Sequence, residues 1–183
     1  MANAASCIAL HKKLNASQSE LQAYFSYLPE LIDNYSLEVA LAYLFLRTEL
    51  AQNRTLYCGV VKLHHADTQI ASNGLESQHL TRNGFLELYS KVFGEKLPTS
   101  VSDKLKTAEM TRDRVIHGKN VTVAQMREAI WAVLDYSEHM NEHLQRKAGF
   151  QPFGDLRGFK GRGKPLDKST SRWLLKGMGF AVA

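Results

Sequence analysis

The chain has 183 residues, of which 44% are hydrophobic and 22% are charged, a composition typical of a folded globular protein. Its two cysteines, Cys7 and Cys58, are too few for a disulfide framework or a zinc site, so we predict small, buried or partly buried thiols. The N-terminal stretch has no basic residue ahead of its short apolar run, and no later segment stays apolar for the roughly 20 residues of a membrane span. We therefore expect a cytoplasmic protein with one core.

The charge is concentrated at the C-terminal end. Residues 150–183 contain seven basic and two acidic side chains, and this excess of +5 equals the net charge of the whole chain. The first 149 residues are therefore neutral overall. A cationic segment beside a neutral body is typical of a segment that meets phosphate groups.

Apolar residues recur at three- and four-residue steps along the first half of the chain. The spacing predicts an amphipathic helix over 17–32 that is bent or restarted at Pro29. The next stretch, from Ser36 to about Ala66, contains no proline and predicts a long, heavily buried central helix. Residues 68–78 contain Ser72-Asn73-Gly74 and predict a loop.

The second half predicts three more helices, each with a glycine at or just after its end. Their expected ranges are 85–93, 98–117 and 122–148, followed or closed by Gly94, Gly118 and Gly149. No segment alternates strictly between apolar and polar residues. We therefore predict an all-α fold, with four or five helices packed as a bundle in a domain over residues 1–149, and a basic, glycine- and aromatic-rich tail over 150–183.

An arginine falls on the apolar side of the helix predicted over 98–117. Its apolar positions Val101, Leu105 and Ala108, extended by helical steps, predict residues 112 and 115 as the next inward positions. Residue 112 is an arginine, whose guanidinium has no neutral form available and is costly to desolvate alone. Arg112 is therefore expected to meet an anion, a polar cavity or a subunit interface.

Two further chemically competent residues follow Arg112. Asp113 and His117 are four residues apart, so they lie on one helix face, where the carboxylate can orient the imidazole. An arginine that binds phosphate and a histidine that exchanges protons near neutral pH are the minimum for phosphodiester chemistry. The alternative is a surface ion pair with a histidine at a helix end.

The pattern Arg112-Asp113-x-x-x-His117, at the end of a helix and before a last amphipathic helix, resembles the motif of the HEPN superfamily. That motif is an Arg, four to six residues, then a His, with a polar residue directly after the Arg. The resemblance covers residues 17–148 and implies an all-α, metal-independent endoribonuclease without a cofactor. Its site forms where two copies of the motif meet across a homodimer.

The resemblance also implies a biological setting. Many members of the superfamily are toxins or phage-defence effectors, and an antitoxin partner is a further expectation. Some are silenced by modification of a tyrosine shortly after the histidine. Residues 118–121 here are Gly, Lys, Asn and Val, so that feature is missing.

Two other histidine patterns could bind a metal. His139-Met140-Asn141-Glu142-His143 fits the His-x-x-Glu-His pattern of inverted zinc proteases. That family needs a further glutamate downstream, and none follows Glu142, so we prefer a solvated helix face. His64-His65, with Asp67 nearby, is more simply explained as cations at a helix end. No metal site is predicted.

The C-terminal segment interleaves aromatic and basic residues, which is the chemistry of sequence-tolerant RNA binding. The basic residues expected to bind RNA are Arg157, Lys160, Arg162 and Lys164, and the aromatic ones are Phe150, Phe153, Phe159 and Trp173. The alternative is a solubilising tail whose aromatic residues fold back onto the protein.

The sequence thus supports a leading hypothesis and two alternatives. The first is a HEPN-type ribonuclease. The others are a catalytically silent HEPN binding or dimerisation module, in which Arg112 only forms an interface ion pair, and a nucleic-acid-binding regulator that acts through residues 150–183.

Overall fold

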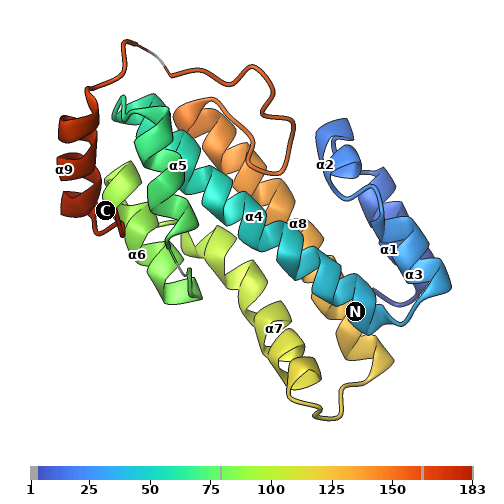
Figure 1. Ribbon diagram of the computed structural model, residues 1–183. Helices are drawn as coiled ribbons and strands as arrows, with labels where there is room; N and C mark the ends of the chain where they lie inside the picture. The colour runs from blue at the N-terminus through green and yellow to red at the C-terminus, as the bar shows by residue number, and fades with distance from the viewer. Residues whose placement is uncertain (1–3, 79, 162, 183) are drawn as a thin grey trace. The chain divides into compact units, whose positions relative to one another are not determined.

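The computed structural model describes residues 4–78, 80–161 and 163–182, and the regular structure in these ranges is all helical (Figure 1). The described helices are α1 Cys7–Asn15, α2 Ser19–Tyr24, α3 Leu28–Asn34, α4 Leu37–Leu63, α5 Thr68–Glu76, α6 Arg82–Phe93, α7 Thr99–Ile116, α8 Val123–Ala148 and α9 Lys168–Met178. The prediction of an all-α fold is confirmed. None of the helices in the described ranges has the length and apolar character needed to cross a membrane.

Four or five helices was too low a count, since nine are described. The segment predicted as one helix before residue 36 is two, α2 and α3, and Pro29 lies in the first turn of α3. Its ring suits that position, where the missing N–H would have no helical partner. Helices α1, α5 and α9 account for the remainder of the difference.

The chain divides into two compact units. The first unit comprises the described residues of Met1–Thr48, together with Pro98–His143 and Phe153–Asp155; the second comprises the described residues of Glu49–Leu97, Leu144–Pro152 and Leu156–Ala183. Helices α4 and α8 contribute residues to both. The predicted boundary between residues 149 and 150 stays a prediction.

An aromatic cluster lies in the core of the first unit. The ring of Phe153 lies 5.5 Å from the ring of Tyr24, 5.9 Å from that of Phe25 and 6.0 Å from that of Tyr136, measured between centroids. The main-chain N–H of Phe153 donates to Oδ1 of Asn141 at 2.9 Å, and Nδ2 of Asn141 donates back to the carbonyl oxygen of Phe153 at 3.2 Å. The buried amide of Asn141 thereby supplies the main-chain N–H and carbonyl of Phe153 with the hydrogen-bond partners that a helix would otherwise provide.

In the second unit, residues 68–76 form α5 where a loop was predicted. The carboxylate of Asp67 accepts from the N–H of Ile70 at 3.0 Å and caps the helix. Ile70, Ala71 and Leu75 are buried. Gly74 is tolerated because a side chain there would meet Val182, with a Cβ only 3.0 Å from its Cγ2. The loop prediction was wrong because Gly74 lies against Val182 and α5 packs on α9, both far along the chain.

We expect Phe153→Ala to lower the free energy of unfolding by about 3–5 kcal/mol, the usual loss when a buried phenylalanine leaves a cavity. Phe153 is 1% exposed and lies among three aromatic rings. Urea denaturation followed by circular dichroism measures the change. Trp173→Ala, at a side chain that is 77% exposed, is the matched control and should alter stability by no more than about 0.5 kcal/mol. Equal losses for the two variants would contradict this description of the core.

Candidate active site on helix α7

Helix α7 carries the three predicted site residues at its C-terminal end. Gly118 has φ of 64°, a left-handed conformation, and its N–H donates to the carbonyl oxygen of Val115 at 3.0 Å. The N–H of Lys119 then donates to the carbonyl oxygen of Arg114 at 2.8 Å. These two hydrogen bonds end the helix, and the left-handed conformation that they need favours glycine at position 118. The predicted stop at Gly118 is confirmed.

The buried side of α7 follows the first three positions of the predicted stripe and then departs from it. Val101, Leu105 and Ala108 are buried as predicted, but the next buried residue is Thr111. The side chain of Arg112 is 27% exposed and lies at the edge of the buried side. The prediction thus placed Arg112 too deep, because the inward position at this turn is taken by the preceding residue, Thr111.

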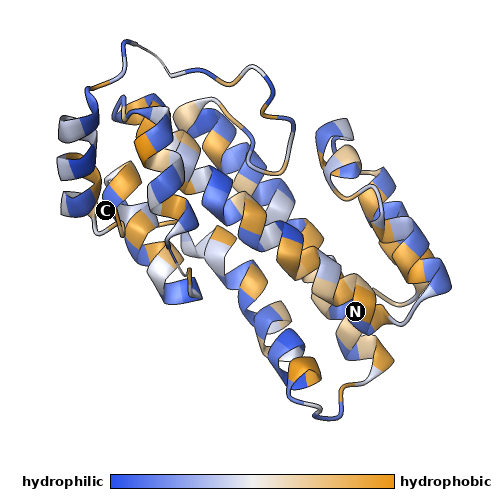
Figure 2. Cartoon of the chain, viewed as in Figure 1, coloured by the Kyte–Doolittle hydropathy of each residue, from blue (hydrophilic) through white to orange (hydrophobic). Residues whose placement is uncertain are grey.

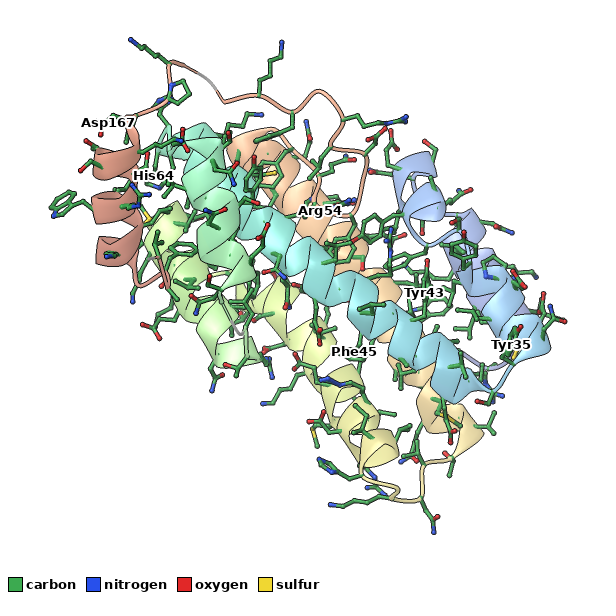
Figure 3. All side chains as sticks on the ribbon, in the orientation of Figure 1. Tyr35, Tyr43, Phe45, Arg54, His64 and Asp167 are labelled. Atoms are coloured by element: carbon green, nitrogen blue, oxygen red, sulfur yellow. The ribbon has the colours of Figure 1, made fainter. Side chains whose placement is uncertain are left out.

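The guanidinium of Arg112 lies against an aromatic ring. Its Cζ is 4.9 Å from the ring centroid of Phe45, a buried residue of α4 that is labelled in Figure 3. The Nε of Arg112 also donates to Oδ1 of Asp113 at 3.3 Å. A weakly hydrated, planar cation suits such a half-buried position, where a lysine ammonium would lose more hydration.

Asp113 therefore interacts with the arginine of the motif. Its carboxylate engages Arg112, and its main-chain carbonyl oxygen accepts from the N–H of His117 at 3.1 Å. His117 is the C-cap residue of α7, and its side chain is exposed. The structure thus brings Arg112 and Asp113 into contact and places His117 one turn further, at the open end of the helix.

Large apolar side chains lie exposed on either side of the motif. Met110 is 63% exposed and Ile116 is 65% exposed. At 100° per residue, Ile116 falls between Arg112 and Asp113 around the helix, and Met110 falls on the side of His117 but two turns, about 10 Å, earlier along the axis. Figure 2 shows this mixture of hydrophobic and hydrophilic residues at the end of α7.

The exposed apolar surface continues onto α4 within the first unit. Val39, Ala42 and Leu46 recur at three- and four-residue steps and are exposed. Ala42 is three residues from Phe45, the residue on which Arg112 lies, and four from Leu46, so it is a helical neighbour of both. The motif therefore borders an apolar strip of a neighbouring helix, the kind of surface that marks an interaction site.

A half-buried charge network holds α7 to α1 and α8. Nζ of Lys104, on α7, lies 2.5 Å from Oδ2 of Asp135 on α8. Lys13 of α1 pairs with both Asp135 and Glu138, and Oγ of Ser17 donates to Glu138 at 2.6 Å. Every charged group of this network has an oppositely charged partner, as partial burial requires.

The rival histidine patterns have structural roles. Nδ1 of His139 donates to the carbonyl oxygen of Asp135 at 2.7 Å, one turn earlier in α8. Nε2 of His64 donates to the carbonyl oxygen of Val92 at 2.7 Å, and Asp67 caps α5. Within the described ranges, no three His, Cys, Asp or Glu side chains are grouped so that they could hold a metal ion.

The described basic residues that were predicted to bind RNA belong to the second unit. Arg157, Lys160 and Lys164 are exposed, and Arg162 lies outside the described residues. Phe150 and Phe153 are buried in different units, so they are not available to stack on bases. Phe159 is half-buried, with its ring 6.4 Å from that of Tyr57. Of the four aromatic residues expected to bind RNA, only Trp173 is exposed.

Comparison of the chain with models of protein families, with curated proteins and with solved structures finds no match.

We expect the network around Asp135 to make stability depend on pH. Burial raises the pKa of Asp135, but the hydrogen bond and charge of Lys104, with the charges of Lys13 and His139, bring it below its usual value. A lowered carboxyl pKa stabilises the folded state above the unfolded value of about 4, and this stabilisation is lost as pH falls through the folded value. Asp135→Asn should therefore be less stable than the unmodified chain at pH 7, and the difference should shrink toward acid pH.

Urea denaturation across a pH series measures this difference. Asp103→Asn, at an exposed position of α7, is the matched control and should leave the pH profile unchanged. A constant difference between Asp135→Asn and the unmodified chain at all pH values would show that the carboxylate charge is not what holds α7.

Proposed function

We propose that the chain is a HEPN-type, metal-independent endoribonuclease that acts as a homodimer, in a toxin or phage-defence setting. His117 is the general acid and base, Arg112 binds the scissile phosphate, and Asp113 orients Arg112. The observation that supports this most is the placement of the three motif residues on an exposed helix end, bordered by the exposed apolar side chains of Met110 and Ile116.

The chemistry accounts for the need for a second copy. In RNA cleavage by transesterification, a base takes the proton of the 2′-OH, the 2′-oxygen attacks phosphorus, and the bond from phosphorus to the 5′-oxygen breaks. An acid then protonates the departing 5′-oxygen. One chain supplies one histidine in the motif, whereas a two-fold dimer supplies two.

The apolar residues beside the motif favour this assembly. Burying Met110 and Ile116 against the same residues of a second copy would remove apolar surface from water and bring the two motifs together. The Phe45 ring and Asp113 hold Arg112 near the surface, so a phosphate could approach it without a large rearrangement. Paired guanidinium groups would stabilise the charge that develops on the phosphate.

We expect His117→Ala to reduce cleavage of a mixed RNA pool by about 10²- to 10⁴-fold, the usual contribution of a general acid or base. The products of the unmodified protein should end in 2′,3′-cyclic phosphate and 5′-hydroxyl groups, and cleavage should persist in a metal chelator. Arg112→Lys keeps the positive charge but loses the planar guanidinium that can donate two parallel hydrogen bonds to a phosphate, so this variant should also cleave RNA more slowly.

His139→Ala is the matched control, because it removes a histidine of α8 that lies outside the motif. It should cleave like the unmodified protein. Cleavage that is unchanged in His117→Ala, with folding and dimerisation preserved, would exclude the proposed enzyme, and a dimer that does not cleave RNA at all would favour the silent module. RNA binding that is lost on removal of residues 150–183, together with a motif that is dispensable for any activity on RNA, would favour the regulator.

A further inference from the structure

Helix α9 is an amphipathic helix at the end of the second unit. The carboxylate of Asp167, labelled in Figure 3, accepts from the N–H of Thr170 at 3.0 Å and from its hydroxyl at 2.6 Å, and so caps the helix. Gly179, with φ of 93°, ends it. Both ends are thus fixed locally, and the helix presents two different faces.

The inner face of α9 is already occupied. Ser171 and Leu175 are buried, and α9 packs on α5 and α6. Oγ of Ser171 accepts from the N–H of Asp67 at 2.9 Å. After the helix, Phe180 is also buried, and the N–H of Ala181 donates to Oε1 of Gln78 at 3.0 Å. The apolar side of the helix is therefore held within the second unit.

The outer face combines one aromatic ring with a row of cations. Trp173 is 77% exposed, the largest value among the exposed large apolar side chains of the described ranges. Lys168, Arg172 and Lys176 are exposed and recur every four residues, about 6 Å apart along the helix. Around the helix, Lys176 lies about 60° from Trp173, Arg172 about 100° and Lys168 about 140°, so Lys176 is beside the ring and the other two cations line the flank of the outer face.

Small residues leave the indole accessible. One turn before Trp173 the chain has Ser169 and Thr170, and one turn after it has Gly177. A Cβ added at Gly177 would meet nothing within 4 Å, so the space beside that position is open. Lys176, three residues after Trp173, is a long neighbour one turn away, and Trp173 is 77% exposed beside it.

We propose that this outer face of α9, formed by Lys168, Arg172, Trp173 and Lys176, is a binding platform for single-stranded nucleic acid. Trp173 stacks on a base, and the three cations neutralise neighbouring phosphates. Stacking on an aromatic ring beside a row of bases is the usual way to bind a single strand without reading its sequence. The excess of +5 in residues 150–183 complements such a polyanion.

The same features argue against a membrane surface as the occupant. A membrane-binding amphipathic helix inserts its apolar face between lipid headgroups. In α9 the apolar face is buried against α5 and α6. Trp173, on the outer face, is the one exposed large apolar side chain of this helix. One indole among cations is suited to stacking on a base, but it offers little area for insertion.

The platform is independent of the proposed ribonuclease, because none of its residues belongs to the motif on α7. It can be tested with a probe that the enzyme chemistry cannot cut. Single-stranded DNA lacks the 2′-OH that transesterification requires, so its binding reports on the platform alone.

The experiment is fluorescence anisotropy of a labelled oligothymidylate, about ten nucleotides long, with the full chain. Trp173→Ala should weaken binding roughly 5- to 150-fold, the loss expected for one stacked base, and Trp173→Phe should restore most of it. Binding should weaken with salt, and the double variant Lys168→Ala, Lys176→Ala should lower the slope of log affinity against log salt by about 0.7 per lost phosphate contact.

A charge-matched control distinguishes α9 from the rest of the basic segment. Lys160→Ala, Lys164→Ala removes the same charge from the preceding segment and should weaken binding less than the change on α9. In a Trp131→Phe background, which leaves Trp173 as the sole tryptophan, binding should also quench the remaining fluorescence.

Three outcomes would overturn the proposal. The first is equal affinity of Trp173→Ala and the unmodified chain, and the second is a larger loss in the Lys160 and Lys164 variant. The third is binding to anionic lipid vesicles in place of the oligonucleotide. Circular dichroism of Trp173→Ala confirms that a loss of binding is not a loss of folding, since this side chain is exposed.

Discussion

The contact between the guanidinium of Arg112 and the ring of Phe45 determines what the end of α7 presents to solvent. Because the guanidinium keeps its charge, it has to remain at the edge of the buried side, where it can face both an aromatic ring and a carboxylate. Asp113 supplies that carboxylate. Besides Arg112 and Asp113, the end of α7 presents three exposed side chains to solvent, Met110, Ile116 and His117.

That arrangement depends on how α7 is supported. Lys104 is eight residues before Arg112 on the same helix, and its pairing with Asp135 ties α7 to α8. Val101, Leu105 and Ala108 supply the apolar contacts on the buried side. The ion pair and the buried apolar side chains thus hold α7 in place. Its last turn, which contains Ile116 and leads to His117, is mainly exposed. A site built in this way has rigid support and an open surface.

Local patterns predicted the elements whose signals are local. The long helix over Leu37–Leu63, the glycine stops at Gly94 and Gly118, and the restart at Pro29 follow from periodicity, left-handed glycine geometry and the proline ring. Helix α5 was missed because its Gly74 is accommodated by Val182, more than a hundred residues away. Phe153 was expected to stack on RNA, yet it is buried by Asn141 and three aromatic rings that no local pattern connects to it. For the candidate site, the sequence located the three residues and the end of the helix, but not the depth of Arg112, because only the tertiary contact with Phe45 fixes it.

The central claim is that the ends of two α7 helices meet, and chemical cross-linking at position 117 tests it most directly. In a Cys7→Ser background the remaining native thiol is Cys58, which is buried, and burial raises its pKa to about 12, so it should not react in the folded protein. His117→Cys in this background should form a covalent dimer with a short bismaleimide at dilute protein concentration. Ser19→Cys, exposed on α2, should remain monomeric under the same conditions. Equal yields of covalent dimer from the two positions would contradict the claim that α7 meets its own copy.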